Sequence, residues 1–269
     1  MLDLQKLFTD LFDPQPGEMA LVLVDTPHGA LHDTPAWQRR RAMAERWRAA
    51  LEQLGAQRGF TVAPLVSFSA TGAHNANLPE EGEQNEQPAR LEALAERATL
   101  LLAMTQFSAS APLIAWTNRF PHLRVASMPM IAPEMEATAL AADYGQVARS
   151  CARLREKLSA ADFARVGFSN GDRLTIDLRY RQAHADDGQL RADKAPPRLV
   201  NLPCGEAYIA AYEGERPGAP SETRGVLPVE WRGETIRLEI ERNQVVDVLG
   251  RGEAASDLRD FLTLDTARR

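Results

Sequence analysis

Apolar runs that alternate with helix patterns constrain this chain most. Met19–Val24 is an almost continuous apolar run that ends at Asp25. Such a strand is typical of a parallel sheet covered by helices on both faces, because every side chain is then buried. Further strands of this kind are predicted at Phe60–Phe68, Thr99–Met104 and Leu123–Met128. The sequence therefore predicts an α/β fold, with a Rossmann-like three-layer domain over residues 1–160.

The segments between these strands are expected to be helices or loops. Trp37, Met43 and Trp47 recur on one side of a helix pattern whose arginines, Arg39, Arg40 and Arg41 among them, lie mostly on the other side. A long helix is predicted from residue 133 to residue 158. Residues 80–88 are acidic and lack apolar periodicity, so we expect a flexible connector or lid there.

The hydrophobic period changes to two from Phe163 onward. Arg173–Arg181 alternates apolar and polar residues, which is typical of a half-buried antiparallel strand. Asn170-Gly171 lies between two such runs and predicts a tight hairpin, because both positions of that turn favour positive φ. Residues 161–269 are therefore expected to form a second, mostly antiparallel β domain that carries the motif Asn201–Glu206.

Composition excludes several classes of partner. With 269 residues, 44% hydrophobic and 25% charged, the chain has the composition of a soluble globular protein. Its formal charge of -6 favours neither nucleic acid nor an anionic membrane as partner. No stretch reaches the ~18 apolar residues of a membrane span, and the two cysteines suggest no disulfide framework. A reducing cytoplasm is the expected location.

The first domain contains few residues that indicate a bound cofactor. No Gly-x-Gly-x-x-Gly follows the first strand, so the sequence does not support dinucleotide binding. His28, His32 and Asp33 are residue types that bind zinc or iron. However, Pro27 and Gly29 place them in a loop, and the favoured interpretation is a polar loop in which Asp33 or Thr34 caps the next helix.

Other chemically able side chains are expected to be structural. His74 lies in a polar loop and is interpreted as a hydrogen-bonding or solvent-facing group. Cys204 stands between Pro203 and Gly205 with no histidine near it in sequence, so a packed turn residue is favoured over a nucleophile or soft metal ligand. Arg181 and Asp172 are expected to brace strands rather than orient a substrate.

Asn201-Leu202-Pro203-Cys204-Gly205-Glu206 is the strongest motif. An apolar run turns sharply through Pro203 and Gly205 and delivers one carboxylate, Glu206, at the start of an alternating stretch. Taken alone, the hexapeptide is compatible with a tight turn that carries a solvated glutamate.

Three ordered blocks give the chain a resemblance to a known family. They are Leu123–Pro129, then Asn170-Gly171-Asp172-x-Leu174-Thr175 with Arg181 and Asp187-Gly188, then Asn201–Glu206. Together they resemble the aminopeptidase T-like metallopeptidases (the M29 family). The same superfamily includes the iron-dependent 2,5-dihydroxypyridine dioxygenases.

The resemblance implies a metal-dependent enzyme. In the peptidases the glutamate that matches Glu206 is a ligand of a two-metal centre, so Glu206 is the candidate metal ligand here, with Zn, Co or Mn as the divalent metal. The family's other ligands lie beyond the point where this sequence stops, and we therefore expect a fragment or truncated member that neither retains the metal nor turns over by itself. Relatives suggest a homodimer that acts on peptides or small molecules. The alternatives are an iron-dependent ring-cleaving dioxygenase and a non-catalytic binding or assembly protein.

Overall fold

The computed structural model describes residues 2–193 and 198–264. These residues form two compact units. The first unit contains the chain up to Cys151 together with Asp186–Glu206, and the second contains Ala152–Ala185 together with the chain from Ala207 onward. The division at residue 160 that the sequence suggests stays a prediction of where domains begin and end.

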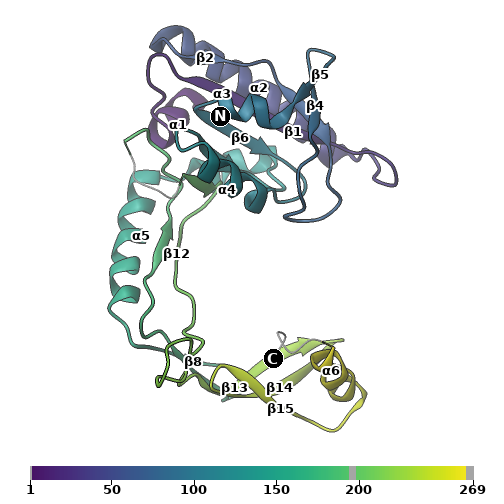
Figure 1. Cartoon of the computed structure of the whole chain (residues 1–269), viewed down its shortest axis with the longest axis vertical. Helices are drawn as coiled ribbons and strands as arrows, with labels where there is room; N and C mark the ends of the chain where they lie inside the picture. Colours follow the sequence, from purple (N-terminus) through teal and green to yellow (C-terminus); the bar gives the residue numbers. More distant parts are fainter. Residues whose placement is uncertain (1, 194–197, 265–269) are drawn as a thin grey trace. The chain divides into compact units, whose positions relative to one another are not determined.

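A mostly parallel sheet with helices on both faces forms the first unit (Figure 1). Its elements in chain order are α1 (Leu4–Leu11), β1 (Met19–Thr26), α2 (Pro35–Arg58), β2 (Thr61–Val62), β3 (Val66–Ser69), β4 (Glu81–Gln84), β5 (Gln87–Arg90), α3 (Leu91–Arg97), β6 (Leu100–Met104), α4 (Ser110–Arg119), β7 (Arg124–Ser127), the 3-10 turns η1 (Pro133–Ala137) and η2 (Ala139–Ala141), the start of α5 (Tyr144–Ser159), and β11 (Leu199–Asn201). The strand order is β11-β7-β6-β1-β3-β4-β5, with β2 beside β1. Strands β11, β7, β6, β1 and β3 are parallel, which confirms the predicted α/β class.

Two cores explain why β1 is apolar at every position. Val22 and Val24 face one buried cluster, which contains Trp47 of α2. Leu21 and Leu23 face a second buried cluster on the other side of the sheet. Both faces of β1 are therefore covered, as expected for a central parallel strand.

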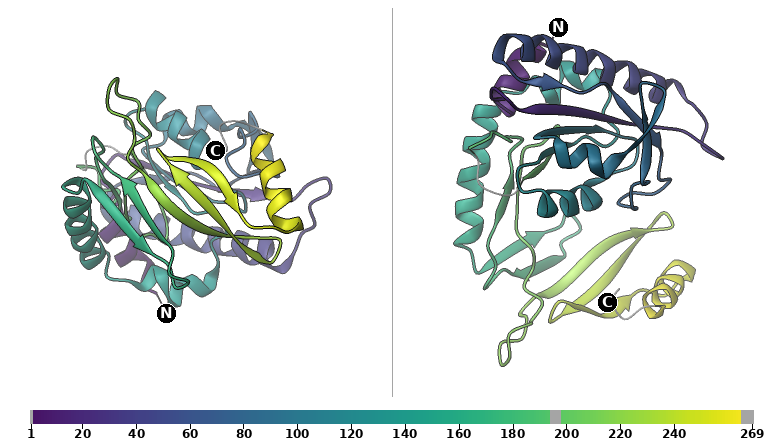
Figure 2. Two further views of the ribbon diagram at one scale, coloured as in Figure 1. Left: turned by 90° about the horizontal axis from the view of Figure 1, so that it is seen from below. Right: turned by 45° about the horizontal axis from the view of Figure 1, so that its top comes forward.

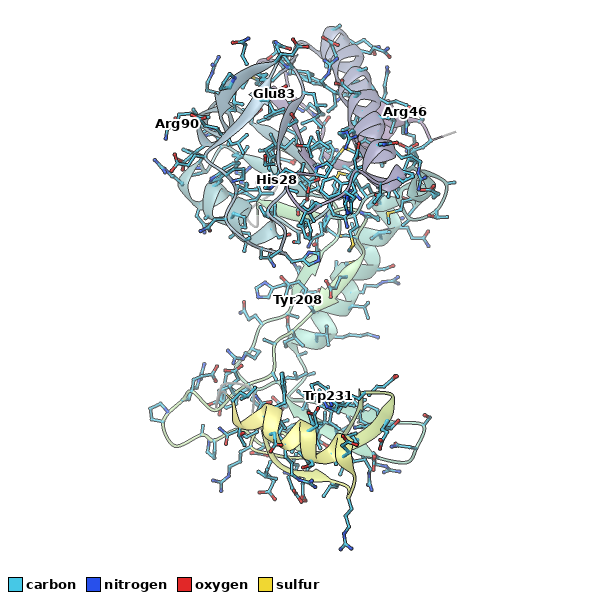
Figure 3. All side chains as sticks on the ribbon, turned by 90° about the vertical axis from the view of Figure 1, so that its right-hand side faces the viewer. His28, Arg46, Glu83, Arg90, Tyr208 and Trp231 are labelled. Carbon is cyan, nitrogen blue, oxygen red and sulfur yellow. The ribbon has the colours of Figure 1, made fainter. Side chains whose placement is uncertain are left out.

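Two expectations for this unit are wrong. Residues 80–88, expected to be a flexible connector, contain β4 and the start of β5, an antiparallel hairpin at the edge of the sheet. Glu83 and Arg90 mark this hairpin in Figure 3. The hairpin is polar because an edge pair is half exposed, so its sequence shows no apolar alternation.

The helix predicted from residue 133 is also wrong in its first part. The 3-10 turns η1 and η2 precede α5, which begins only at Tyr144. Within α5, Tyr144 and Cys151 are buried, whereas Leu154 is 53% exposed.

The second unit is a five-stranded antiparallel sheet with one helix. Its elements in chain order are the end of α5, β8 (Phe163–Gly167), β9 (Arg173–Asp177), β13 (Arg224–Trp231), β14 (Glu234–Glu241), β15 (Gln244–Leu249) and α6 (Glu253–Thr263). The strand order is β15-β14-β13-β9-β8, and α6 lies along this sheet (Figure 2). Leu238 and Ile240 form its core with Leu258 of α6. The predicted antiparallel sheet is confirmed.

The hairpin predicted at Asn170-Gly171 is present and joins β8 and β9. Its turn differs from the predicted one, because residues 168–172 separate the strands and only Gly171, not Asn170, has a positive φ, of 92°. A separate two-stranded sheet pairs β10 (His184–Asp186) with β12 (Glu206–Tyr208). Of the helices in the described chain, none combines the length and apolar character needed to cross a membrane.

Asp177, at the end of β9, is expected to make the second unit acid-sensitive. Burial favours its neutral form, but hydrogen bonds from Arg179 and from the backbone N–H groups of Glu222 and Arg179 outweigh burial and lower its pKa. The pKa of Asp177 is about 3.9 in the unfolded chain and lower in the folded one, so its ionised carboxylate stabilises the fold at pH values above about 3.9. This stabilisation is lost as the pH falls through the pKa of the folded state.

We therefore expect exchange of the Arg179 and Glu222 amides, which donate to the Asp177 carboxylate, to accelerate as the pH drops below about 4, after correction for intrinsic exchange rates. Asp177→Asn is expected to lose about 1–3 kcal/mol of local stability at pH 7 and to show a weaker pH dependence. An unchanged pH dependence in the variant would contradict this assignment.

Candidate functional site

The Asn201–Glu206 motif leaves the carboxyl end of a parallel strand. β11 pairs with β7 in parallel register, Val200 beside Ala126 and Asn201 beside Ser127. The backbone N–H of Leu202 donates to the carbonyl of Ser127 at 3.0 Å. The motif thus starts at the sheet edge where open α/β folds bind their ligands.

Asp186 holds the first half of the motif in place. One of its carboxylate oxygens accepts from the Asn201 backbone N–H at 3.0 Å and from Asn201 Nδ2 at 3.1 Å. Its other carboxylate oxygen accepts from Cys204 Sγ at 3.1 Å, and its carbonyl accepts from the same thiol at 2.5 Å. One carboxylate therefore fixes both ends of the turn.

The hydrogen bonds continue from Asn201 to α4. Ser110 Oγ donates to Asn201 Oδ1 at 3.1 Å and lies 3.0 Å from the buried Ser127 Oγ. The turn is thereby tied to β7, α4 and β10. Sequence reasoning missed Asp186 and Ser110, since Asp186-Asp187-Gly188 reads as an ordinary turn and Ser110 as one hydroxyl among several.

Cys204 is a packed thiol, as the sequence suggests. Burial raises its pKa, and the neighbouring Asp186 carboxylate raises it further. A thiol held in its protonated form is a poor nucleophile and a poor soft metal ligand, because both roles need the thiolate. The hydrogen bonds from the Cys204 thiol to Asp186 are sufficient to explain Cys204 as a structural residue of the turn.

Glu206 is exposed at the start of β12. No hydrogen bond or ion pair of its carboxylate is present among residues 2–193 and 198–264, so this group is available to a ligand. Within the same residues, no three His, Cys, Asp or Glu side chains are grouped so that they could hold a metal ion. The described residues therefore do not fit a complete metal centre, and Glu206 stays a predicted ligand.

Among the residues that the structure describes, the histidine loop after β1 belongs to no group of three side chains that could hold a metal ion. His28 Nε2 lies 3.0 Å from the carbonyl of Ala70 (His28 is labelled in Figure 3). Asp33 instead forms a bidentate ion pair with Arg41, at 2.9 and 2.7 Å. Thr34 is the N-cap residue of α2, although its side chain makes no capping hydrogen bond.

The remaining candidates have structural partners. His74 Nδ1 accepts from the Ser108 backbone N–H at 3.0 Å. Arg237 pairs with Asp172, at 2.9 Å from Nε, and lowers the pKa of that carboxyl. Arg181 is paired with Glu215 and donates to the carbonyl of Ala211 at 3.0 Å.

Comparison with known proteins supports the fold. No protein-family model matches the chain, and no curated protein matches it. Among solved structures, 2,5-dihydroxypyridine dioxygenase from Pseudomonas putida KT2440 is similar with a TM-score of 0.62 at 17% identity, over 97% of this chain and 71% of that one. AmpT from Thermus thermophilus is similar with a TM-score of 0.47 at 14% identity, over 99% of this chain and 75% of that one. At 17% identity, the dioxygenase structure shows that this chain shares its fold.

Proposed function

We propose that this chain carries the scaffold of a metal-dependent hydrolase that removes N-terminal residues from peptides, with Glu206 as one ligand of its divalent metal. The observation that carries the proposal is the placement of the motif. Asp186, Ser127 and Ser110 fix the turn at the carboxyl end of β11, and the Glu206 carboxylate emerges from it without a partner among the described residues. A carboxylate that the fold positions but does not use is suited to bind a cation.

Glu206 alone is not a working site. A catalytic zinc ordinarily takes about three protein ligands, and the described residues supply one candidate. We therefore propose that the chain does not turn over by itself and that Zn, Co or Mn binds only when further ligands are supplied. A cytoplasmic homodimer completes this proposal, by analogy with the superfamily.

The test is an aminopeptidase assay on the complete gene product. Release of N-terminal residues from short peptides is expected when Zn, Co or Mn is added, and Glu206→Gln is expected to reduce it by about 100-fold or more, because a neutral amide is a weak ligand for a hard dication. Glu96→Gln is a matched control, since Glu96 is exposed on α3, far from the motif in sequence. Metal-stimulated release that survives Glu206→Gln would contradict the role of this residue.

A ring-cleaving iron dioxygenase is the second candidate. The fold similarity to 2,5-dihydroxypyridine dioxygenase favours it. Oxygen uptake by the complete gene product with dihydroxypyridines and ferrous iron, without release of residues from peptides, would select this function. Inactivity in both assays would instead favour a non-catalytic binding or assembly protein, which the lack of a three-ligand group among the described residues supports.

A further inference from the structure

A second polar cluster lies at the centre of the parallel sheet. The strand order places β1 between β3, which follows it in the chain, and β6, which comes later. The direction of winding reverses between β1 and β6, and open α/β sheets bind ligands in the crevice at such a reversal, beyond the carboxyl ends of the strands. Asp25 near the end of β1 and Gln106 after the end of β6 lie at this point.

Asp25 is a buried carboxylate held by the loop after β6. Its side chain is 2% exposed, and both of its oxygens accept from the backbone N–H of Gln106, at 2.9 and 2.8 Å. Burial raises the pKa of Asp25, while this hydrogen bond and the charge of Arg40 act in the opposite direction. A carboxylate has about four lone-pair sites, so Asp25 retains capacity for a further donor.

Arg40 is the cationic partner in this cluster, although the sequence places it with the arginines on the solvent side of α2. It is 4% exposed, donates from Nε to the carbonyl of Ile131 at 3.2 Å and donates from Nη2 to Gln106 Oε1 at 2.7 Å. Among the described residues, Arg40 and Asp25 form no ion pair within 4.0 Å, and Gln106 bridges them instead.

One arm of the Arg40 guanidinium lacks a hydrogen-bond partner. Nη1 is buried and has no acceptor within the described part of the chain. The ring of Trp37, whose centroid lies 5.7 Å from the guanidinium carbon, contributes a cation–π contact but no lone pair. A buried N–H group without an acceptor destabilises the fold, and more so when it is charged, so its retention calls for a ligand or a water.

Arg40 provides the two N–H donors of a carboxylate-binding site, of which only one has an acceptor among the described residues. A guanidinium binds a carboxylate best through two parallel N–H···O bonds. Here Nη2 donates to the neutral amide oxygen of Gln106, whereas Nη1 has no acceptor among the described residues. Gln106 and Phe107 are only partly buried, so the side of the cluster that carries Gln106 is the one that faces solvent.

The geometry points to a binding site for a free α-amino acid, whose carboxylate displaces Gln106 Oε1 and bridges both arms of Arg40 and whose ammonium group donates to Asp25. The paired charges of Arg40 and Asp25 select a zwitterion, because a simple anion is repelled by Asp25 and a simple cation by Arg40. The edge contact between Trp37 and Phe107, with ring centroids 6.5 Å apart, places aromatic surface beside the guanidinium for an apolar side chain. This site uses no metal and does not depend on Glu206.

The test is calorimetric titration of the full chain with L-leucine, acetate and methylammonium as separate probes. L-Leucine is expected to bind saturably and at least tenfold more tightly than acetate or methylammonium. Arg40→Lys is expected to weaken the binding of L-leucine at least tenfold, because a lysine cannot donate two parallel hydrogen bonds to a carboxylate. Asp25→Asn is expected to weaken this binding by a similar factor. Gln106→Ala is expected to strengthen binding a few-fold, because it removes the competing oxygen.

Arg41→Gln is the matched control, since Arg41 neighbours Arg40 but pairs with the exposed loop residue Asp33. It is expected to bind L-leucine with unchanged affinity. A folded wild-type chain that binds no probe, as expected if one buried water satisfies Nη1, would overturn the proposal. Acetate binding as tight as L-leucine, or weaker binding in Gln106→Ala, would also overturn it, and neither result requires the Arg40 and Asp25 variants to fold.

Discussion

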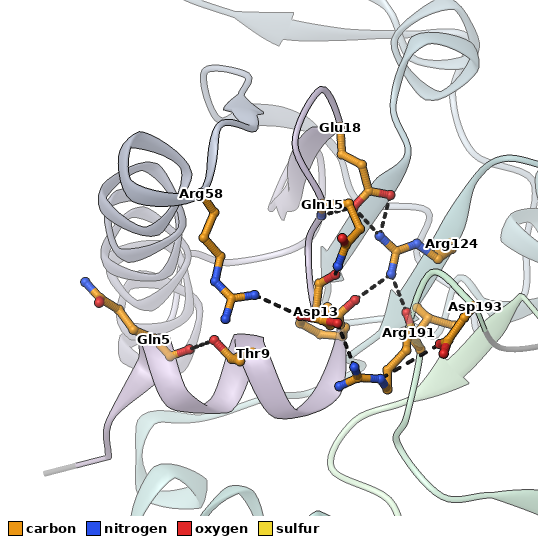
Figure 4. A network of polar contacts seen from close by, with 11 residues as sticks. Gln5, Thr9, Asp13, Gln15, Glu18, Arg58, Arg124, Arg191 and Asp193 are labelled. Carbon is orange, nitrogen blue, oxygen red and sulfur yellow. Dashed lines mark hydrogen bonds and ion pairs between the residues drawn. The ribbon is translucent and has the colours of Figure 1, made fainter.

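Replacing Arg124 with leucine is expected to lower the free energy of unfolding of the first unit by about 3–5 kcal/mol. The Arg124 side chain is 1% exposed on β7 and reaches three chain segments at once. Nη2 donates to both carboxylate oxygens of Glu18 at 2.6 Å, and Nη1 donates to the carbonyls of Phe12 and Leu190 at 2.7 and 2.5 Å (Figure 4). Leucine leaves the Glu18 carboxylate without its cationic partner and two carbonyls without their donor.

Two further variants separate charge from packing at this position. Arg124→Lys is expected to recover only part of the loss, since an ammonium does not match the bidentate geometry. The double variant Arg124→Leu with Glu18→Leu is expected to be more stable than Arg124→Leu alone, because it removes the unpaired carboxylate. Arg119→Gln, which breaks the exposed pair with Glu92, is the control and is expected to change stability by less than about 1 kcal/mol. Urea titrations that give Arg124→Leu and Arg119→Gln the same small loss would contradict this account of Arg124.

Replacing Trp47 with alanine is expected to cost about 3–5 kcal/mol. Trp47 is completely buried on α2, and its ring meets Phe8 of α1 edge-on with centroids 5.3 Å apart. Its Nε1 also donates to Glu136 Oε1 at 2.7 Å, which ties η1 to α2. Alanine removes the ring, the hydrogen bond and the contact that joins three elements.

The phenylalanine variant tests the two contributions separately. Trp47→Phe keeps most of the volume, and Glu136 keeps its ion pair with Arg46, so a loss of only about 1–2 kcal/mol is expected. Trp116→Ala on α4 is the control for loss of an indole, with a smaller cost expected because Trp116 is only half-buried. Equal losses for the alanine and phenylalanine variants, measured by urea titration, would show that packing of Trp47 against Phe8 is not what stabilises this region.

The elements that the sequence predicts well are those that it encodes locally. The continuous apolar run of β1 and the Asn170-Gly171 hairpin depend on neighbouring residues, and both are present. The β4–β5 hairpin was missed because its residues are polar, and their strand conformation depends on pairing with β3. Helical periodicity likewise fails for Arg40, because its burial depends on Gln106 and Ile131, which are far away in the chain.

The candidate site is predictable only in part for the same reason. The order of the motif blocks identifies Asn201–Glu206, but Asp186, which fixes the turn, contacts it through side-chain hydrogen bonds that no spacing encodes. Nor does the sequence indicate that residues 199–201 return to the parallel sheet as β11 after the excursion through β8 and β9. Pairing partners that are distant in the chain decide these features.

We propose that Glu206 is a positioned carboxylate that does not hold a metal by itself. The most direct test of this claim is the metal content of the purified 269-residue chain after incubation with Zn, Mn or ferrous iron and dialysis against metal-free buffer. We predict no stoichiometric retention of any of the three metals, in the chain and in its Glu206→Gln variant alike. Retention of one or two ions per chain that is lost in Glu206→Gln would contradict the claim, because it would show that this chain builds a complete metal centre around Glu206.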